Sequence, residues 1–189
     1  MIKKIALSSI FTVGILLQGC SHSKHNDNKQ AQENSLIASN QYVLKSLNNQ
    51  TYTIVNQANQ YQLQNTKAKL VIIDLFATWC PPCRAEASRL AEIQALYPKA
   101  IKVIGLSVQR DITPSKLKLF RQNYGATYTL LYSNKNQELA SMIAQTIPNL
   151  PANFPIPLMA IYKNGVLVKY FIGAAPQEMV LGTIKTLLK

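Results

Sequence analysis

Histidine and cysteine, the residues that most often bind transition metals, are scarce in this sequence. Its 189 residues include two histidines, His22 and His25, and three cysteines. A structural zinc site usually combines two spaced pairs of these residues, and only one pair, Cys80 and Cys83, is present. Covalent haem attachment would require His directly after Cys83, where Arg84 stands. The sequence therefore predicts no metal site, and we interpret both histidines as solvated residues of a polar segment.

Acidic residues are also few, with 8 Asp and Glu against 20 Lys and Arg, and the formal net charge is +12. A basic surface favours anionic lipid headgroups or acidic protein partners. The basic residues are scattered along the chain and form no block of the kind that binds nucleic acid. The N-terminus, moreover, is typical of an exported protein. We therefore expect no nucleic-acid partner.

The N-terminal apolar stretch, residues 5–17, is too short to span a bilayer as a helix. Two lysines precede it, as in the charged region of a secretory signal. It leads into Leu17-Gln18-Gly19-Cys20, which resembles the bacterial lipobox, whose cysteine is acylated and becomes the mature N-terminus. We expect residues 1–19 to be a lipoprotein signal peptide and Cys20 to be the lipidation site. The alternative is an ordinary secretory signal that leaves Cys20 as an unmodified thiol.

Residues 20–40 contain almost no apolar side chains, so they cannot bury enough surface to fold. We interpret them as an acylated flexible tether and residues 41–189 as one domain. The expected location is the bacterial cell envelope, with the protein anchored to the membrane through the lipid on Cys20 and facing the periplasm. If Cys20 carries lipid, the two remaining cysteines form a pair in a compartment where disulfides persist.

The central stretch of this domain runs from a strand through the two cysteines into a helix. Residues 70–76 are apolar and partly β-branched, which predicts a buried strand. Two prolines follow Cys80 and are tolerated in a first helical turn, so we expect a helix over residues 82–97. A helix N-terminus stabilises a nearby thiolate, the nucleophile in disulfide exchange. We assign Cys80 as the exposed attacking thiol and Cys83 as the buried resolving thiol.

The rest of the domain alternates strands and helices. Apolar periodicity and turn residues predict a hairpin at 42–55, an edge strand near 61–63, strands at 101–108 and 128–132, helices at 114–124 and 137–146, strands at 158–162 and 166–172, and a last helix from about 176. The Asn-Gly turn at 164–165 is a strong hairpin signal. This order predicts an α/β fold in which helices flank a mixed β-sheet that carries an N-terminal β-hairpin.

Two separate motifs resemble the thioredoxin superfamily. Residues 74–83, DLFATWCPPC, are similar to its active-site strand and turn, and residues 156–165, IPLMAIYKNG, to the segment in which a cis-proline opens a strand. Together with the export signal and the hairpin, the sequence CPPCRAE most resembles membrane-anchored TlpA/ResA-type thiol–disulfide oxidoreductases. The resemblance covers residues 41–189 and implies a thioredoxin-like fold.

The resemblance also implies roles for individual residues. Pro157 would be cis and face the thiols, and the backbone of Ile156 would pair with a substrate polypeptide. Asp74, six residues before Cys80 as in the thioredoxins, would lie below the resolving thiol and accept its proton. The alternative for Asp74 is a hydrogen-bonded residue with no chemical role. Trp79 would shape the docking surface or simply pack. No second carboxylate is apparent near the cysteines.

The predicted function is an extracytoplasmic thiol–disulfide oxidoreductase with no cofactor beyond its redox-active disulfide. The two prolines between the cysteines offer no imidazolium for a strongly oxidising site. We therefore favour a reductase of envelope proteins such as apocytochrome c, recharged by a membrane thiol electron donor. A periplasmic disulfide oxidase or isomerase and a copper-binding thioredoxin-like chaperone are the alternatives. Ser88 and Leu158 replace the Pro and Thr common in TlpA-type chains, which leaves the substrate open.

Overall fold

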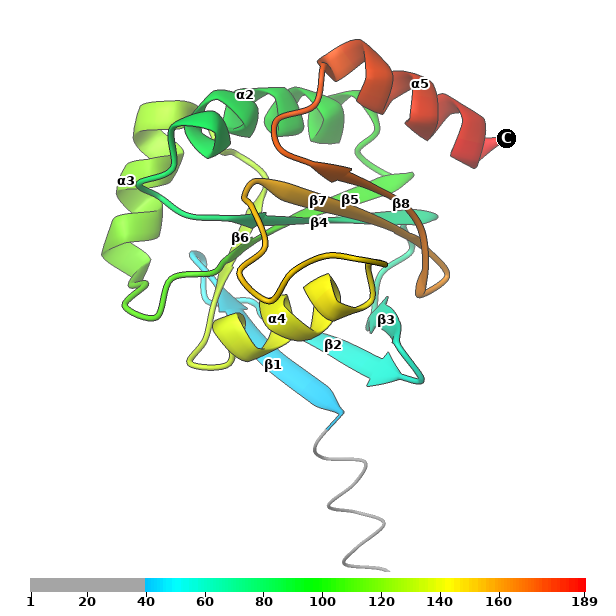
Figure 1. Ribbon diagram of the computed structural model, residues 1–189. Helices are drawn as coiled ribbons and strands as arrows, with labels where there is room; N and C mark the ends of the chain where they lie inside the picture. Colours follow the sequence, from blue (N-terminus) through cyan, green and yellow to red (C-terminus); the bar gives the residue numbers. More distant parts are fainter. Residues whose placement is uncertain (1–39) are drawn as a thin grey trace, which may run out of the picture. The chain divides into compact units, whose positions relative to one another are not determined.

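The computed structural model of the protein describes residues 40–189 (Figure 1). The predictions for the signal peptide, for Cys20 and for the tether lie outside these residues. In chain order the elements are β1 (Gln41–Ser46), β2 (Thr51–Gln57), β3 (Gln60–Leu63), β4 (Leu70–Phe76), α2 (Pro81–Leu96), β5 (Ile101–Ser107), α3 (Pro114–Tyr124), β6 (Thr129–Tyr132), α4 (Asn136–Gln145), β7 (Leu158–Lys163), β8 (Val166–Ile172) and α5 (Gln177–Leu188). Among the described residues, no helix has both the length and the apolar character needed to cross a bilayer.

The strands form one mixed sheet in the order β3-β2-β1-β6-β5-β4-β7-β8. β4 lies inside it, parallel to β5 and antiparallel to β7, and every one of its residues is buried. A strand covered on both faces needs apolar side chains on both, which explains the continuous apolar run of residues 70–76. The predicted mixed sheet and the N-terminal hairpin, formed by β1 and β2, are therefore confirmed.

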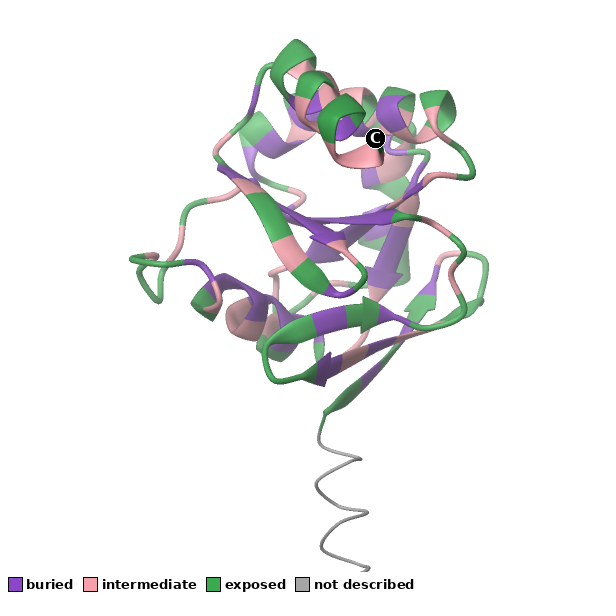
Figure 2. Cartoon of the chain, turned by 90° about the vertical axis from the view of Figure 1, so that its right-hand side faces the viewer, coloured by how far each residue is buried: buried purple, intermediate pink, exposed green. Residues whose placement is uncertain are grey.

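Helices cover both faces of the central strands, with α2, α3 and α5 on one face and α4 on the other (Figure 1). Side chains alternate along β4 and divide the core in two. Its even-numbered apolar residues pack with α2 and α3, whereas its odd-numbered residues pack with α4. Figure 2 shows the buried central strands between helices whose outer surfaces are exposed. Asp74, an even-numbered residue, belongs to the face that α2 covers.

The helix beginnings follow from local sequence. Cys80 is the N-cap of α2, and prolines occupy the first two helical positions, where no intrahelical acceptor is lost. Thr113 caps α3 because its Oγ1 accepts a hydrogen bond from the Lys116 N–H at 3.2 Å. Gly125 then ends α3 in the left-handed conformation, with φ of 65°. These starts and stops are the ones that the sequence predicts.

Differences from the expected elements are small. Most strand and helix boundaries lie within one or two residues of the predicted ones, and the segment 148–157, which contains four prolines, forms no helix or strand. α2 spans 81–96 where 82–97 was expected. Its last residue, Leu96, is 60% exposed, and the next residue, Tyr97, packs against the core.

The C-terminal hairpin brings the two edges of the sheet into contact. Asn164 and Gly165 both have positive φ, 53° and 81°, as a type I′ turn between β7 and β8 requires. The Tyr61 N–H, in the edge strand β3, donates to the carbonyl oxygen of Gly165 at 2.8 Å. The Tyr61 ring also meets the Tyr162 ring edge-on, with centroids 5.8 Å apart. The sheet therefore curls until the β2–β3 hairpin touches the β7–β8 hairpin.

Candidate active site

Cys80 and Cys83 form a disulfide at the N-terminus of α2. The Sγ of Cys80 lies 3.4 Å from the Cys83 N–H, from which it accepts. The Cys80 carbonyl oxygen accepts a hydrogen bond from the Arg84 N–H at 3.1 Å. The first N–H groups of a helix have no intrahelical partner, and they stabilise negative charge on a sulfur placed beside them. When the disulfide is reduced, Cys80 is therefore the better placed of the two sulfurs to exist as a thiolate.

Both sulfur-bearing residues are buried, each with 2% of its surface exposed. The prediction of an exposed Cys80 is therefore wrong for the oxidised protein. The reason is that Cys80 Sγ is bonded to Cys83 and lies 3.7 Å from the carbonyl oxygen of Ile156, whose side chain packs on the same cluster. The Ile156 backbone therefore lies directly beside the buried sulfur of Cys80.

The loop before β7 supplies that neighbouring backbone. The Ile156–Pro157 peptide bond is cis, as the resemblance implied. Pro157 is buried, and its carbonyl oxygen accepts a hydrogen bond from the Gly173 N–H at 2.8 Å. Leu158, the first residue of β7, pairs with Leu75 near the end of β4. This register places the loop beside the turn that carries Cys80.

Trp79, directly before Cys80, is 61% exposed and lines a cleft of about 260 Å³. Its other walls come from the end of β5, from α4 and from the proline-rich loop: Val108, Gln137, Ala140, Ser141, Ala152, Asn153, Phe154 and Ile156. No charged side chain lines the cleft, although the chain as a whole is strongly basic. A larger hollow of about 820 Å³, between β8 and the β2–β3 turn, contains none of the predicted site residues.

Two carboxyl groups are buried on the α2 side of the sheet. Asp74 in β4 and Glu86 in α2 are each 3% exposed. The Tyr128 hydroxyl donates to Asp74 Oδ2 at 3.1 Å, and the Ala175 N–H donates to Glu86 Oε1 at 3.4 Å. Their second oxygens, Asp74 Oδ1 and Glu86 Oε2, have no hydrogen-bond partner within the described part of the chain. Each carboxyl therefore keeps one lone-pair-bearing oxygen free to take a proton.

Burial is the main reason that both carboxyl groups hold their protons tightly. It raises the pKa of Asp74 well above its usual value, and the nearby charge of Glu86 raises it further, while the hydrogen bond from Tyr128 opposes the change. Burial likewise raises the pKa of Glu86 to about 7, against the hydrogen bond from Ala175 and the charge of Arg89. A carboxyl group that exchanges its proton near neutral pH, as Glu86 does, is suited to acid–base work.

Glu86 is the site residue that the sequence analysis missed, since it found no second carboxylate near the cysteines. The sequence did contain a signal that Glu86 is buried near the cysteines. Glu86 follows Cys83 by one helical turn and lies beside Ala87, in the stripe that continues to Leu90 and Ile93. An acidic residue inside an apolar stripe on the face of Cys83 is buried when that stripe is buried.

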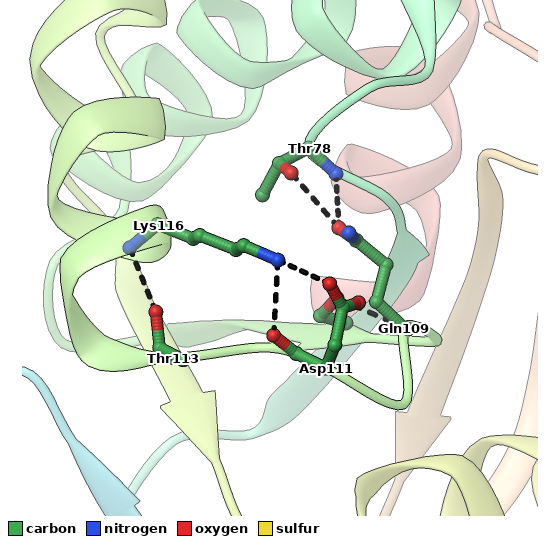
Figure 3. A network of polar contacts seen from close by, with 6 residues as sticks. Thr78, Gln109, Asp111, Thr113 and Lys116 are labelled. Carbon is green, nitrogen blue, oxygen red and sulfur yellow. Dashed lines mark hydrogen bonds and ion pairs between the residues drawn. The ribbon is translucent and has the colours of Figure 1, made fainter.

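Hydrogen bonds fix the turn that precedes Cys80 (Figure 3). Gln109 Oε1 accepts from the N–H and the hydroxyl of Thr78, at 2.7 and 2.9 Å. Arg84 Nε donates to the Thr78 carbonyl oxygen at 2.8 Å, and its guanidinium lies 5.2 Å from the ring centre of Tyr124. In the loop that follows Gln109, Asp111 accepts from the Lys116 ammonium. The turn is thus tied to α2 and to the loop after β5.

Three comparisons place this geometry among known proteins. A family model described as Redoxin matches residues 28–188. ResA, a thiol-disulfide oxidoreductase of Bacillus thuringiensis, is 27% identical over 130 residues, which are 68% of this chain and 69% of that protein. A thioredoxin of Listeria monocytogenes is 28% identical over 118 residues, 61% of this chain and 80% of its own. A thiol:disulfide interchange protein of Chlorobium tepidum superposes with a TM-score of 0.61 at 18% identity, covering 79% of this chain and 94% of its own.

Proposed function

The chain belongs to the Redoxin family and is a thiol–disulfide oxidoreductase of the ResA type, and we propose that it reduces disulfides of other proteins in the bacterial cell envelope. One observation carries the proposal. The Cys80–Cys83 disulfide lies at a helix N-terminus, against the backbone of Ile156 and beside an uncharged cleft. This arrangement provides a stabilised nucleophile, a second thiol within reach and a surface for a polypeptide.

The reaction has two exchange steps. In the reduced protein, the Cys80 thiolate attacks one sulfur of a client disulfide, and the other client sulfur leaves as a thiolate. Cys83 then loses its proton and attacks Cys80 Sγ, which breaks the mixed disulfide and releases the second client thiolate. The client gains two electrons, and the protein ends with the Cys80–Cys83 disulfide. In these steps the exchanging atoms of the protein are the sulfurs of Cys80 and Cys83, and no metal or organic cofactor is needed.

Asp74 and Glu86 are the proton acceptors for Cys83 in this proposal. Both are buried on the side of the sheet that α2 covers, and Glu86 follows Cys83 by one turn. A buried thiol cannot pass its proton directly to water, so a carboxylate nearby lowers the cost of forming the attacking thiolate. Whichever carboxylate takes the proton then loses it to solvent before the next cycle.

The client lies along Ile156 and Trp79. Its backbone pairs with that of Ile156 as an added strand, and side chains next to its cysteine enter the uncharged cleft beside Trp79. A reductase must be recharged, and a thiol electron donor in the membrane fills that role. Lipid on Cys20 would hold the domain near such a donor, facing the periplasm, where envelope proteins such as apocytochrome c are candidate clients.

Trapping tests the proposal. Cys83→Ser removes the resolving thiol, so the variant should accumulate a mixed disulfide between Cys80 and its client, which mass spectrometry of the adduct identifies. Cys80→Ser and the double variant are the matched controls and should trap nothing. Adducts on Cys80→Ser but not on Cys83→Ser would reverse the two roles. Tight stoichiometric binding of Cu(I) by residues 41–189 of the reduced protein, without reductase activity, would contradict the proposal as a whole.

Acylation of Cys20 is tested by a separate experiment. Cells that express the full chain are fed an alkyne-labelled fatty acid, and the protein should carry the label and sediment with membranes. Cys20→Ala should abolish both. Label that persists in the variant, or an unlabelled wild-type protein, would contradict acylation at Cys20.

A further inference from the structure

Tyr128 gives the carboxyl group of Asp74 its single hydrogen bond within the described residues. The two lie 54 positions apart in the sequence, and the Tyr128 hydroxyl donates to Asp74 Oδ2 at 3.1 Å. Both side chains are buried, at 2% and 3% exposure. The Tyr128 backbone is fixed as well, because Arg121 in α3 donates from Nη2 to its carbonyl oxygen at 3.1 Å. Arg121 therefore fixes the backbone from which the Tyr128 side chain reaches the carboxyl group.

Gly105 makes room for the Tyr128 ring. It is the β5 residue that pairs with Asp74 across the parallel ladder. A Cβ atom built on Gly105 would lie 2.9 Å from Cε2 of Tyr128 and 2.7 Å from Cδ2 of Leu130. Contacts this short force side chains to shift, so any residue larger than glycine would press on the ring. The absence of a side chain at position 105 is thus a condition for the Tyr128–Asp74 hydrogen bond.

We infer that Tyr128 is a positioning residue whose hydrogen bond favours the carboxylate form of Asp74, the form that can take the proton of Cys83. The inference rests on the proposed function and assigns a part of it to a residue outside both recognised motifs. A hydroxyl that donates to a carboxylate favours the charged form. Burial disfavours the charged form of Asp74 by raising its pKa, and the Tyr128 hydrogen bond partly offsets this effect by lowering the pKa.

Few other charged or titratable groups act on the Asp74 carboxyl group. Its strand neighbours are Gly105 in β5 and Met159 in β7, which carry no charge. From α2, the Glu86 carboxyl and the Cys83 sulfur face the same side of the sheet, and Arg89 acts on Glu86. Glu86 disfavours ionisation of Asp74, whereas the Tyr128 hydrogen bond favours it. The two carboxyl groups titrate together, and Tyr128 is the donor that acts on Asp74 alone.

The chemical consequence concerns the second exchange step only. The S–H proton of Cys83 moves to an Asp74 carboxylate oxygen, the Cys83 sulfur bonds to Cys80 Sγ, and the client sulfur leaves with the electron pair of the broken bond. Without the Tyr128 hydroxyl, a smaller fraction of Asp74 is ionised at pH 7. The step should then require a higher pH, while the first attack by Cys80 should not change.

The test uses 5,5′-dithiobis(2-nitrobenzoate) as the disulfide probe and reduced protein in a stopped-flow instrument. Cys80 attack releases one equivalent of the coloured thiolate, and resolution by Cys83 releases the second in a later phase. Tyr128→Phe should move the pH midpoint of the later phase upward by about one to two units, the effect of losing one charge-assisted hydrogen bond. The midpoint of the first phase should stay in place. In the Glu86→Gln background only Asp74 titrates, and the same upward shift should appear.

Two further variants keep the test decisive. Tyr162→Phe removes a hydroxyl from another buried tyrosine, on the opposite face of the sheet, and should move neither midpoint. Gly105→Ala should shift the later phase in the same direction as Tyr128→Phe, and add nothing to it in the double variant. An unshifted later phase in Tyr128→Phe, or an equal shift in Tyr162→Phe, overturns the inference and leaves the proposed function intact. A wild-type protein that releases only one equivalent of the coloured thiolate overturns both.

Discussion

Cys80 Sγ lies 3.7 Å from the carbonyl oxygen of Ile156, although the two residues are 76 positions apart in the chain. The contact arises because β4 and β7 are antiparallel neighbours, so Cys80, which caps α2, and Ile156, two residues before β7, meet at one end of the sheet. The backbone of Ile156 and the cleft that Ile156 and Trp79 line therefore lie next to the sulfur of Cys80.

Phe154 should matter for protein substrates but not for small ones. It lines the cleft beside Trp79 and Ile156, away from the sulfurs. Phe154→Ala should lower the second-order rate of insulin reduction by about five- to thirtyfold, since ~1–2 kcal/mol of apolar contact is lost. Reaction with the small aromatic disulfide should be unchanged. Phe171→Ala, which removes a buried aromatic ring of β8 that does not line the cleft, is the stability control; equal losses with both substrates would place the effect on folding instead of docking.

The reduction potential should identify the direction of electron flow. Two prolines between the cysteines provide no cation to stabilise the reduced form. The Cys80–Cys83 couple should therefore have a potential nearer the ~−270 mV of thioredoxin than the ~−120 mV of a strong oxidant. Equilibration with glutathione redox buffers measures it, and ~30 mV corresponds to ~1.4 kcal/mol. A value near the oxidant would favour the disulfide oxidase or isomerase alternative.

Glu86 should make the oxidised protein less stable as the pH rises. Its folded-state pKa of about 7 lies above the ordinary 4.5, so the folded state binds the proton more tightly than the unfolded chain does. The associated stability is complete below about pH 4.5 and is lost as the pH rises through 7. Glu86→Gln should therefore be more stable than wild type at pH 8, by roughly 3 kcal/mol, and equal to it near pH 4.

Urea unfolding at a series of pH values measures this difference. The matched control is Glu178→Gln, which alters an exposed glutamate in the first turn of α5 and should leave the pH dependence of wild type unchanged. A wild-type unfolding free energy that does not decline between pH 4.5 and 8 would show that Glu86 is not protonated in the way we describe.

Gln109 should support the turn before Cys80 without taking part in proton transfer. Its Oε1 accepts both hydrogen bonds from Thr78 (Figure 3). Gln109→Ala leaves a partly buried N–H unpaired, so we expect a loss of ~1–2 kcal/mol in unfolding free energy and a slower first exchange step with no shift in its pH midpoint. Gln122→Ala, on the exposed side of α3, is the control. A pH shift in Gln109→Ala would contradict a purely supporting role.

Sequence reasoning captured the features that depend on neighbouring residues. The Asn164–Gly165 turn needs two residues that tolerate positive φ, and few others do. The cap at Thr113 and the stop at Gly125 are equally local. The apolar run of β4 predicted a strand buried on both faces, and the cysteine pair predicted the site at its end. Each of these inferences needed about ten residues of context at most.

The features that sequence reasoning missed depend on contacts between distant segments. Tyr128, directly before β6, reaches Asp74 in β4 across β5, which carries glycine at the matching position. Cys80 is buried because a loop from much later in the chain packs against it. Neither periodicity nor spacing reports such pairings. Glu86 is the exception, since its place in the buried stripe of α2 was visible and was overlooked.

The contact between Tyr61 and Gly165 bears on self-association. Outer strands of open sheets present unpaired N–H and C=O groups, which let copies of a protein join edge to edge and polymerise. Here the N–H of Tyr61 in the outer strand β3 is already used, and its ring is held against Tyr162. A second copy would have to break this closure before it could add a strand to β3. Edge-to-edge association of copies through β3 is therefore disfavoured.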